Sequence, residues 1–323
     1  MTTPHLEPNR PSPEGEETWD SRGRFRPLVF GEALFDHFPD GSRVLGGAPF
    51  NVAWHLRGFK TDPLMVSGVG EDPEGKEILD RMASWGMARS GIQVHPTRPT
   101  GKVTAHLDGD QPSYDIEPEQ AYDAVGIDGL PPEADLRRTA LLYHGSLGLR
   151  EATAARTLIH LKKQLGTPVF VDVNLRDPWW SPQGTHNQIR GADWVKVNLE
   201  EASRLAGLPT DTEAALLETA GFLKQELDIK NLVVTMGEDG AWAFTEDGVT
   251  RQRAVVVADI VDTVGAGDGF SSVLALGIHG RWPVSLTLRR ASEFAGELCR
   301  IRGAIPDDSD LYLRYLRRWD HAE

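Results

Sequence analysis

The sequence predicts an α/β protein with a doubly wound, mostly parallel sheet flanked by helices and a small antiparallel extension. Short apolar runs alternate with longer amphipathic segments along most of the chain, which is typical of strands joined by helices. Residues 168–176 form a near-continuous apolar run, as in a strand covered on both faces. Residues 101–116 instead alternate between apolar and polar, with Asp108-Gly109 at the break, which predicts a hairpin with one solvated face.

The first half of the chain supplies two strand–helix units before the hairpin. A buried strand ends at Gly31, and a helix follows a Gly-Gly turn. A second strand covers 62–70. Its helix covers 72–86, because Asp-Pro is typical of a helix start and glycine of a helix end.

The second half returns to strands that alternate with helices. Strands are predicted at 140–147, at 168–176 and at the start of 192–207, which runs on into a helix. A strand, a glycine turn and a second strand cover 231–244. The remaining predicted helices cover 151–166, the segment up to about residue 279, 284–302 and 311–319. In such sheets ligands bind at the carboxyl ends of the strands.

Composition and charge exclude several classes of protein. The chain has 323 residues, of which 40% are hydrophobic and 25% charged, as in ordinary globular proteins. The net charge of −14 argues against a nucleic-acid-binding protein, which usually carries a basic face. No apolar run approaches the roughly 20 residues that a membrane span needs. We therefore expect neither nucleic-acid nor membrane partners.

The N-terminal segment and the cysteine content bear on organisation and compartment. Residues 1–23 are rich in Pro, Glu and Arg and contain no apolar signal-peptide core, which predicts a disordered tail. Residues 24–323 are then expected to form one domain. A single cysteine, Cys299, excludes an intrachain disulfide and fits the reducing cytoplasm, where we expect the protein to reside.

The stretch "DTVGAGDGF", residues 262–270, is the first candidate site. An apolar helix follows it, so Gly265, Ala266 and Gly267 form a helix N-terminus whose N–H groups lack intrahelical acceptors. Such a terminus favours phosphate. Asp268 would repel phosphate but could take the proton of a hydroxyl that attacks it. From these residues alone, a plain glycine turn before an acidic helix start is an open alternative.

Two further polar clusters lie near strand ends. The spacing of Asn198 and Glu201 is that of an ordinary helix capping box. Arg176 could bind phosphate oxygens in a bidentate manner, or it could pair with Asp177 at the surface.

The motifs together resemble the ribokinase-like (PfkB) family of sugar kinases. "GGAPFNVAWHL" is similar to the family's N-terminal glycine motif, and "DTVGAGDGF" to its C-terminal signature. "VNLEE" resembles its Asn-x-x-Glu motif and "TMGEDG" its nucleotide turn. The four occur in the family's order, and the resemblance covers about residues 27–318.

The resemblance implies a role for each matching residue. Asp268 would activate the sugar hydroxyl, and the N–H groups of Gly265, Ala266 and Gly267 would form an anion hole for the transferring phosphoryl group, with Arg176 beside it. The residues implied for the sugar are Asp36, Gly46, Gly47 and Asn51. Those implied for ATP and a water-mediated Mg²⁺ are Asn198, Glu201, Thr235, Gly237 and Gly240. Asp262 would contribute to a monovalent cation site, such as one for K⁺.

The resemblance also implies a lid and a substrate. Segments near 33–45 and 98–122 would form a β-lid over the sugar, and lids of this family often pair two subunits into a homodimer. "DVNLR" and "GEALFDHFPDG" resemble the fructokinase branch most, which implies D-fructose as acceptor. The alternatives are a kinase for 2-keto-3-deoxygluconate, another sugar or a nucleoside, or a sugar or nucleotide sensor without activity. An acid sugar would need a further cation near the sugar, and Arg43 and Arg57 are not clearly placed for this.

Overall fold

A computed structural model describes residues 25–106 and 113–320. Within these ranges the main sheet has nine strands in the order β13-β12-β11-β10-β9-β8-β1-β4-β5. Strands β12 and β13 are antiparallel to their neighbours, and every other pairing in the sheet is parallel. The strands are β1 Pro27–Phe30, β4 Leu64–Gly70, β5 Ile92–His95, β8 Leu141–His144, β9 Val169–Asp172, β10 Trp194–Asn198, β11 Asn231–Thr235, β12 Ala241–Thr245 and β13 Gly248–Gln252. The predicted fold class is confirmed.

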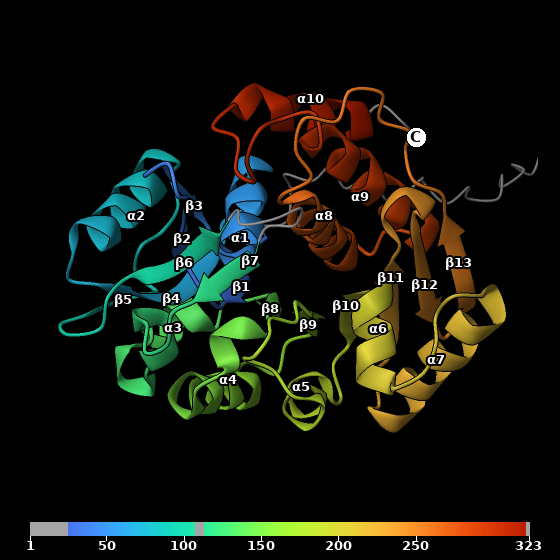
Figure 1. The fold of residues 1–323 in the computed structure, drawn as a ribbon, viewed down its shortest axis with the longest axis horizontal. Helices are drawn as coiled ribbons and strands as arrows, with labels where there is room; N and C mark the ends of the chain where they lie inside the picture. The colour runs from blue at the N-terminus through green and yellow to red at the C-terminus, as the bar shows by residue number, and fades with distance from the viewer. Residues whose placement is uncertain (1–24, 107–112, 321–323) are drawn as a thin grey trace, which may run out of the picture.

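Helices cover both faces of this sheet, as Figure 1 shows. On one face lie α1 Ala48–Gly58, α2 Pro73–Ser84, α8 Ala266–Gly280, α9 Val284–Leu298 and α10 Ser309–Asp320. On the other lie α3 Glu133–Leu136, α4 Ala152–Leu165, α5 Pro182–Ile189, α6 Leu199–Ala206 and α7 Glu213–Glu226. The central strands β1 and β8 are buried along their whole length because side chains on both of their faces pack against helices.

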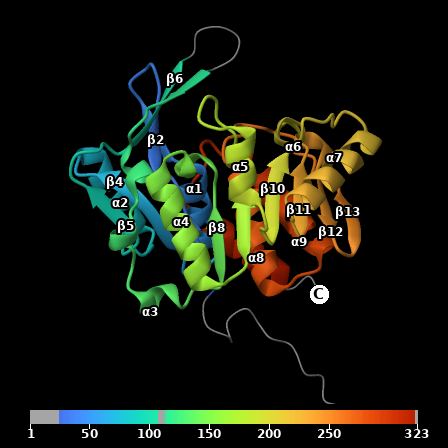
Figure 2. The same ribbon diagram turned by 90° about the horizontal axis from the view of Figure 1, so that it is seen from below.

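A second, four-stranded sheet stands out from the body (Figure 2). Its order is β3-β2-β6-β7, and its strands are β2 Leu34–His37, β3 Arg43–Gly46, β6 Gly101–His106 and β7 Ser113–Ile116. The outer pairs are antiparallel, as predicted, but β2 and β6 at its centre pair in parallel. The sheet therefore joins the two segments that were predicted to form a lid.

Several element boundaries differ from the prediction. Strand β9 ends at Asp172 rather than at residue 176, and α9 ends at Leu298 rather than at residue 302. The carbonyl of Cys299, just past α9, accepts the N–H groups of Val261 and Asp262, so the chain there packs against the glycine-rich loop. Strand β5 and helices α5 and α7 were not predicted.

The structure also bears on membrane association. None of the helices in the described part of the chain is both long and apolar enough to cross a bilayer.

Candidate active site

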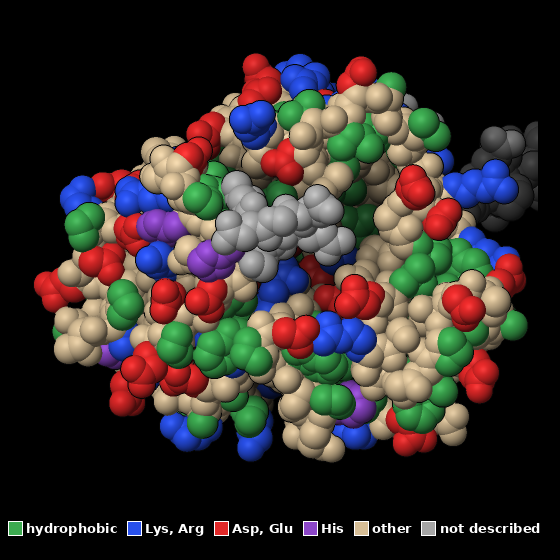
Figure 3. Space-filling view, in the orientation of Figure 1, with side chains coloured by type: hydrophobic (Ala, Val, Ile, Leu, Met, Phe, Trp, Pro, Cys, Tyr) green, Lys and Arg blue, Asp and Glu red, His purple; other side chains and the backbone are tan. Residues whose placement is uncertain are grey.

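The two glycine-rich motifs meet where α1 and α8 begin. Asn51, in the first turns of α1, donates from Nδ2 to Oδ2 of Asp268 at 2.7 Å, although the two residues are 217 positions apart in sequence. Gly47 starts α1 with a φ of 103°, and a Cβ there would lie 2.6 Å from the Glu32 carbonyl oxygen. Only glycine fits this turn, which brings Asn51 toward α8. Figure 3 shows a hollow near the centre of the face where charged side chains of both signs gather.

Opposing effects act on the ionisation of Asp268. Burial raises the pKa of its carboxyl to about 7, while the Asn51 hydrogen bond and the Lys196 ammonium lower it. The nearby carboxylates of Asp172 and Glu32 also contribute to the raised pKa of Asp268. A carboxyl that titrates near neutral pH is suited to accept a proton from a substrate hydroxyl.

Three small residues form the start of α8. Gly265 is the N-cap in the left-handed region, with φ 80°, and a Cβ there would lie 2.4 Å from that of Ala304. The N–H of Ala266 donates to the Thr263 carbonyl at 3.3 Å, so it is partly engaged. Gly267 is exposed, and a Cβ added there would meet, among the described residues beyond its own helix turn, only Lys196 Nζ, at 3.7 Å. The most open approach to the helix N-terminus is therefore at Gly267.

Asp36, Gly46 and Asn51 surround one polar space. A Cβ on Gly46 would lie 3.4 Å from Asp36 Oδ2 and 3.8 Å from Asn51 Oδ1. The latter oxygen is buried and has no hydrogen-bond partner in the part of the chain that the structure describes. Burial raises the pKa of Asp36 to about 6, and Arg176 lowers it. These acceptors lie where a sugar hydroxyl could donate to them.

Arg176 lies in the segment that follows β9, and its charge acts on Asp36. Asp177 pairs with Arg204 rather than with Arg176, so the surface ion-pair alternative is wrong. Among the described residues, the only hydrogen-bond acceptor of the Arg176 guanidinium is its neighbour's carbonyl, that of Leu175, at 3.3 Å. Arg176 also lines a cavity of about 340 Å³ together with Asn174, Trp179 and Trp180. Its position permits contact with a ligand.

Asn198 and Glu201 form a complete capping box at the start of α6. Each accepts the other's backbone N–H at 2.8 Å, and Glu201 Oε1 also accepts the N–H of Leu175 at 3.1 Å. Burial raises the pKa of Glu201, and these N–H groups together with Lys196 lower it. Both carboxylate oxygens are engaged, so the pair fits a metal ion that keeps its waters better than one bound directly.

The predicted nucleotide turn lies beside this box. Thr235 at the end of β11 is in register with Asn198 at the end of β10. Gly237 and Gly240 have φ values of 56° and 100°, and a Cβ on Gly240 would lie 2.1 Å from the Gln252 carbonyl oxygen. The structure therefore places both motifs at neighbouring carboxyl ends of the parallel sheet.

Asp262 fixes the loop before α8. Its two carboxylate oxygens accept the N–H groups of Val264 and Gly303, each at 3.0 Å. Apolar side chains of the same loop are exposed, most of all Val256, which is 92% exposed. In residues 25–106 and 113–320, no three or more His, Cys, Asp or Glu side chains are grouped to hold a metal ion.

Comparison with known proteins identifies the family. A model described as pfkB family carbohydrate kinase matches residues 31–310. The chain belongs to the pfkB family of carbohydrate kinases. The bifunctional protein HldE of Wolinella succinogenes is 26% identical to this kinase over 294 residues, which are 83% of this chain and 59% of that protein. The kinase thus spans about three-fifths of that relative's length.

Solved structures share the fold of this kinase. A fructokinase of Xylella fastidiosa with bound ATP superposes with a TM-score of 0.79 at 22% identity, covering 92% of this chain and 99% of that one. A 2-dehydro-3-deoxygluconokinase of Thermotoga maritima superposes with a TM-score of 0.78 at 17% identity, covering 91% and 100% of the two chains. At these identities the likeness establishes the fold alone.

Sequence reasoning missed two buried charged residues of the kinase. Glu32 follows β1 and is 3% exposed, and its Oε2 atom has no hydrogen-bond partner among residues 25–106 and 113–320. Burial raises the pKa of Glu32 to about 7, and Arg176 is among the groups that lower it. Lys196 lies inside β10, where its ammonium contacts Asp172 at 2.7 Å. The available signal was a charge in or directly after an apolar strand, in "VFGE" and "WVKV".

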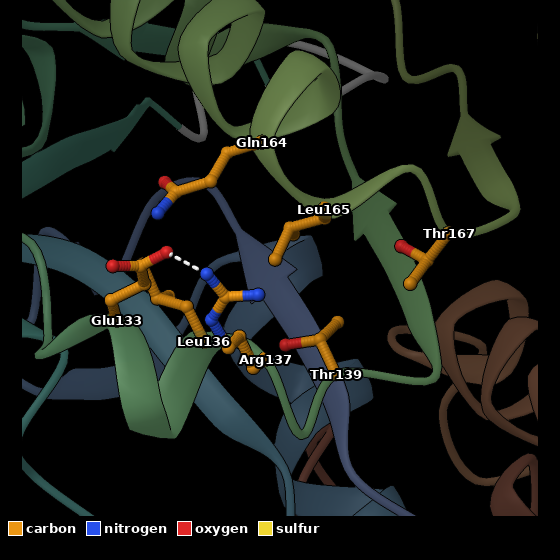
Figure 4. Close-up of a pocket in the computed structure, with 7 residues that line it drawn as sticks. All are labelled: Glu133, Leu136, Arg137, Thr139, Gln164, Leu165 and Thr167. Atoms are coloured by element: carbon orange, nitrogen blue, oxygen red, sulfur yellow. Dashed lines mark hydrogen bonds and ion pairs between the residues drawn. The ribbon is translucent and has the colours of Figure 1, made fainter.

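A further cavity, of about 420 Å³, lies away from the candidate site. Figure 4 shows its lining from α3 and α4, including the Glu133–Arg137 pair. Thr139 and Thr167 of this lining precede β8 and β9, so the cavity lies at the amino ends of these strands. Ligands of doubly wound sheets bind at the opposite edge, and we do not assign this cavity to the active site.

Proposed function

We propose that this kinase transfers the γ-phosphate of ATP to a primary hydroxyl of a ketose, D-fructose, to give fructose 6-phosphate. The observation that carries the proposal is the Asn51–Asp268 hydrogen bond, because it joins the sugar floor to the helix N-terminus that would receive phosphate. The choice of fructose rests on the resemblance of residues 31–41 and 172–176 to fructokinases.

The chemistry follows from the positions of these side chains. The reacting hydroxyl of the sugar would donate a hydrogen bond to Asp268. Asp36 and Asn51 would accept hydrogen bonds from other hydroxyls of the same sugar. As the sugar oxygen bonds to the γ-phosphorus, Asp268 takes the proton, and the bond from that phosphorus to the bridging oxygen breaks to release ADP. The N–H groups at Gly265, Ala266 and Gly267, together with Arg176, would stabilise the charge on the transferring group.

The proposed cofactors bind on the nucleotide side. Asn198 and Glu201 would hold waters of Mg²⁺, which when bound neutralises phosphate charge. Thr235, Gly237 and Gly240 would shape the turn that receives the nucleotide phosphates. Asp262 would help to hold K⁺ near α8, together with backbone carbonyls.

We also propose that the small sheet acts as the lid and as a dimer interface. Closure would exclude water and so limit ATP hydrolysis. Its two outer strands expose apolar side chains, Val44 on β3 at 41% and Tyr114 on β7 at 52%. Unpaired strand edges with such side chains favour pairing with a second copy. Light scattering of the wild type and of Tyr114→Lys tests this, with a dimer expected only for the wild type.

A kinase for an acid sugar is a second candidate. Arg43 pairs with Glu74 and Glu77, and Arg57 donates to the carbonyls of Trp85 and Thr61, so neither is available. Arg176 faces Asp36 and could receive a carboxylate instead. Activity on 2-keto-3-deoxygluconate rather than on fructose would favour this candidate.

The test is ATP-dependent phosphorylation by the wild type and Asp268→Asn. The panel holds fructose, ribose, glucose, tagatose, 2-keto-3-deoxygluconate and adenosine, with Mg²⁺ and with or without K⁺. We expect turnover of fructose and a loss of roughly 100-fold or more in the variant, the usual contribution of a general base. Binding of a sugar or ATP without turnover of any panel member would instead favour the sensor.

A further inference from the structure

A buried lysine lies beside the first turn of α8. Lys196 is the third residue of β10, and its side chain is only 10% exposed. Its Nζ donates to Asp172 Oδ1 at 2.7 Å. Burying such a pair costs desolvation energy that the attraction often only balances. Stability alone is therefore a weak reason for this charge to lie here.

Asp172 is held from three sides, so it fixes the ammonium. Its Oδ2 accepts Ser271 Oγ at 2.5 Å and the Tyr143 hydroxyl at 3.1 Å. Ser271 belongs to α8, and its Oγ also lies 3.0 Å from the Gly267 carbonyl. The network thus ties β8, β9 and β10 to the first turns of α8.

The ammonium of Lys196 lies next to Gly267. A Cβ at Gly267 would be 3.7 Å from Nζ, and within the described part of the chain no other atom beyond its own helix turn would come within 4 Å of it. The positive charge therefore lies next to the point where the N-terminus of α8 is most open. Because the Lys196 side chain is only 10% exposed, solvent screens its charge less than it would at the surface.

We propose that Lys196, fixed by Asp172, is a positioning residue that supplies permanent positive charge to the anion hole and stabilises the transferring phosphoryl group through Gly267. This inference rests on the proposed function, since it needs a phosphoryl group at α8. Strand β10 would then contribute two residues to the reaction, Lys196 and Asn198. Charge that is already in place costs no reorganisation when the transition state forms.

The same charge acts on Asp268. The charged and titratable groups that face Asp268 are Lys196 from β10, Asp172 from β9, Tyr143 from β8 and Glu32 after β1. Glu201 from α6 faces Lys196. Because Lys196 lowers the pKa of Asp268, its loss should move the acidic limb of the pH–rate profile to higher pH. The Asp172 carboxylate raises the pKa of Asp268, so its neutralisation should move the acidic limb to lower pH.

The experiment is a double-mutant cycle of Lys196→Met and Asp172→Asn. We expect Lys196→Met to lower kcat by roughly 100-fold, as for loss of one oxyanion donor, with KM for the sugar changed only a few-fold. The double variant removes both charges and leaves none unpaired, so it carries the test even if Lys196→Met does not fold. We expect its kcat to remain as low as that of Lys196→Met. Lys162→Met, a half-buried lysine on α4 that donates to the Gln188 carbonyl, is the control and should retain wild-type kcat.

Recovery of kcat in the double variant to within a few-fold of the wild type would overturn the proposal, because it would assign the pair a structural role only. Binding of ADP with Mg²⁺ and aluminium fluoride, which mimics the phosphoryl group, is the second measurement. The double variant should lose affinity for this mixture by at least ~10-fold while it binds MgADP alone as the wild type does. Equal affinity for the mixture would contradict the proposal. This binding does not depend on the acceptor, so it stays decisive even if the wild type phosphorylates no panel sugar, which would refute the proposed function instead.

Discussion

At the scale of single residues, the site is a set of acids whose ionisation is controlled by a few neighbours. Asp268, Glu32 and Asp36 all have pKa values raised by burial, to about 7, 7 and 6. Asn51, Lys196 and Arg176 each lower at least one of them. The balance between these groups should set the pH at which the kinase works.

Asn51→Leu should move the pH dependence of turnover. The Asn51 amide lowers the pKa of Asp268, so its loss raises that pKa above about 7. Because the ionised form accepts the proton, kcat/KM should reach its plateau at a higher pH than in the wild type. Profiles from pH 5.5 to 9 check this. Asn187→Leu, on the exposed face of α5, is the matched control, and an unmoved limb in Asn51→Leu would argue against Asp268 as the base.

Glu32→Gln should stabilise the protein, and more so as the pH rises. The folded-state pKa of Glu32 is raised from 4.5 to about 7, so the folded protein holds a proton there that the unfolded chain has released. The stability that this proton contributes is complete below about pH 4.5 and is lost as the pH rises through about 7. The glutamine cannot ionise, so the variant does not lose this stability. Its free energy of unfolding should therefore exceed that of the wild type by ~2–3 kcal/mol above pH 7.

Urea unfolding at pH 5 and pH 8 measures this difference. The buried histidines His55 and His144, whose pKa values are lowered by burial, change stability in the opposite direction below pH 6.5. Both histidines are present in the wild type and in the variant, so their effect on stability cancels in the difference between the two proteins. An advantage that does not grow between the two pH values would contradict the assignment.

The sequence identified polar residues at turns better than those inside strands. Asp36, Asn51 and Asp268 lie in glycine-rich motifs, where small residues indicate close approach. Lys196 lies within an apolar strand and Glu32 comes just after one, so the local pattern gives no sign that either side chain enters a polar site. Their partners, such as Asp172, are distant in sequence, and only the fold brings them together.

At the scale of elements, Gly265, the N-cap of α8, and Gly267, in its first turn, have different functions. Gly265→Ala should lower stability by about 2 kcal/mol or more, because its φ of 80° is costly for alanine and Ala304 occupies the space. Gly267→Ala meets no such contact and should leave stability unchanged or raise it by up to about 1 kcal/mol. Its methyl group would nevertheless cover the open helix terminus, so kcat should fall. Thermal unfolding with kinetics separates the two, and a fully active Gly267→Ala would argue against a phosphate there.

Elements with regular patterns were predictable, and short or amphiphilic ones were not. Strands β1, β4 and β8 are apolar runs, and Asp72 caps α2 by accepting the Gly75 N–H at 2.7 Å, as its sequence suggests. Helix α7, by contrast, has exposed apolar side chains on its outer face, including Leu217 and Phe222. Its apolar residues therefore do not repeat at the helical spacing of a single buried face. Strand β5 has four residues and pairs with β4 at the edge of the sheet, so little of its sequence is constrained by burial.

At the scale of the whole molecule, we expect residues 24–323 to act as one unit. A variant that lacks residues 1–23 should keep the kcat and the melting temperature of the full chain. One that lacks residues 1–26 also loses Phe25, which stacks on His279 at 4.0 Å, and Arg26, which pairs with Asp62. That variant should lose ~3 kcal/mol or more, the usual cost of a buried aromatic side chain. Equal stability of the two truncations would contradict the boundary.

The Asn51–Asp268 contact has a consequence for biosynthesis. Its halves lie in the first and last thirds of the chain. A ribosome makes the proposed sugar-binding residues, the small sheet and all strands of the main sheet before it makes α8. Incomplete chains would therefore hold no base and no phosphate site, whatever sugar they can bind. A growing or prematurely ended polypeptide of this kinase should consume no ATP, and activity should arise only when the last three helices have emerged and packed.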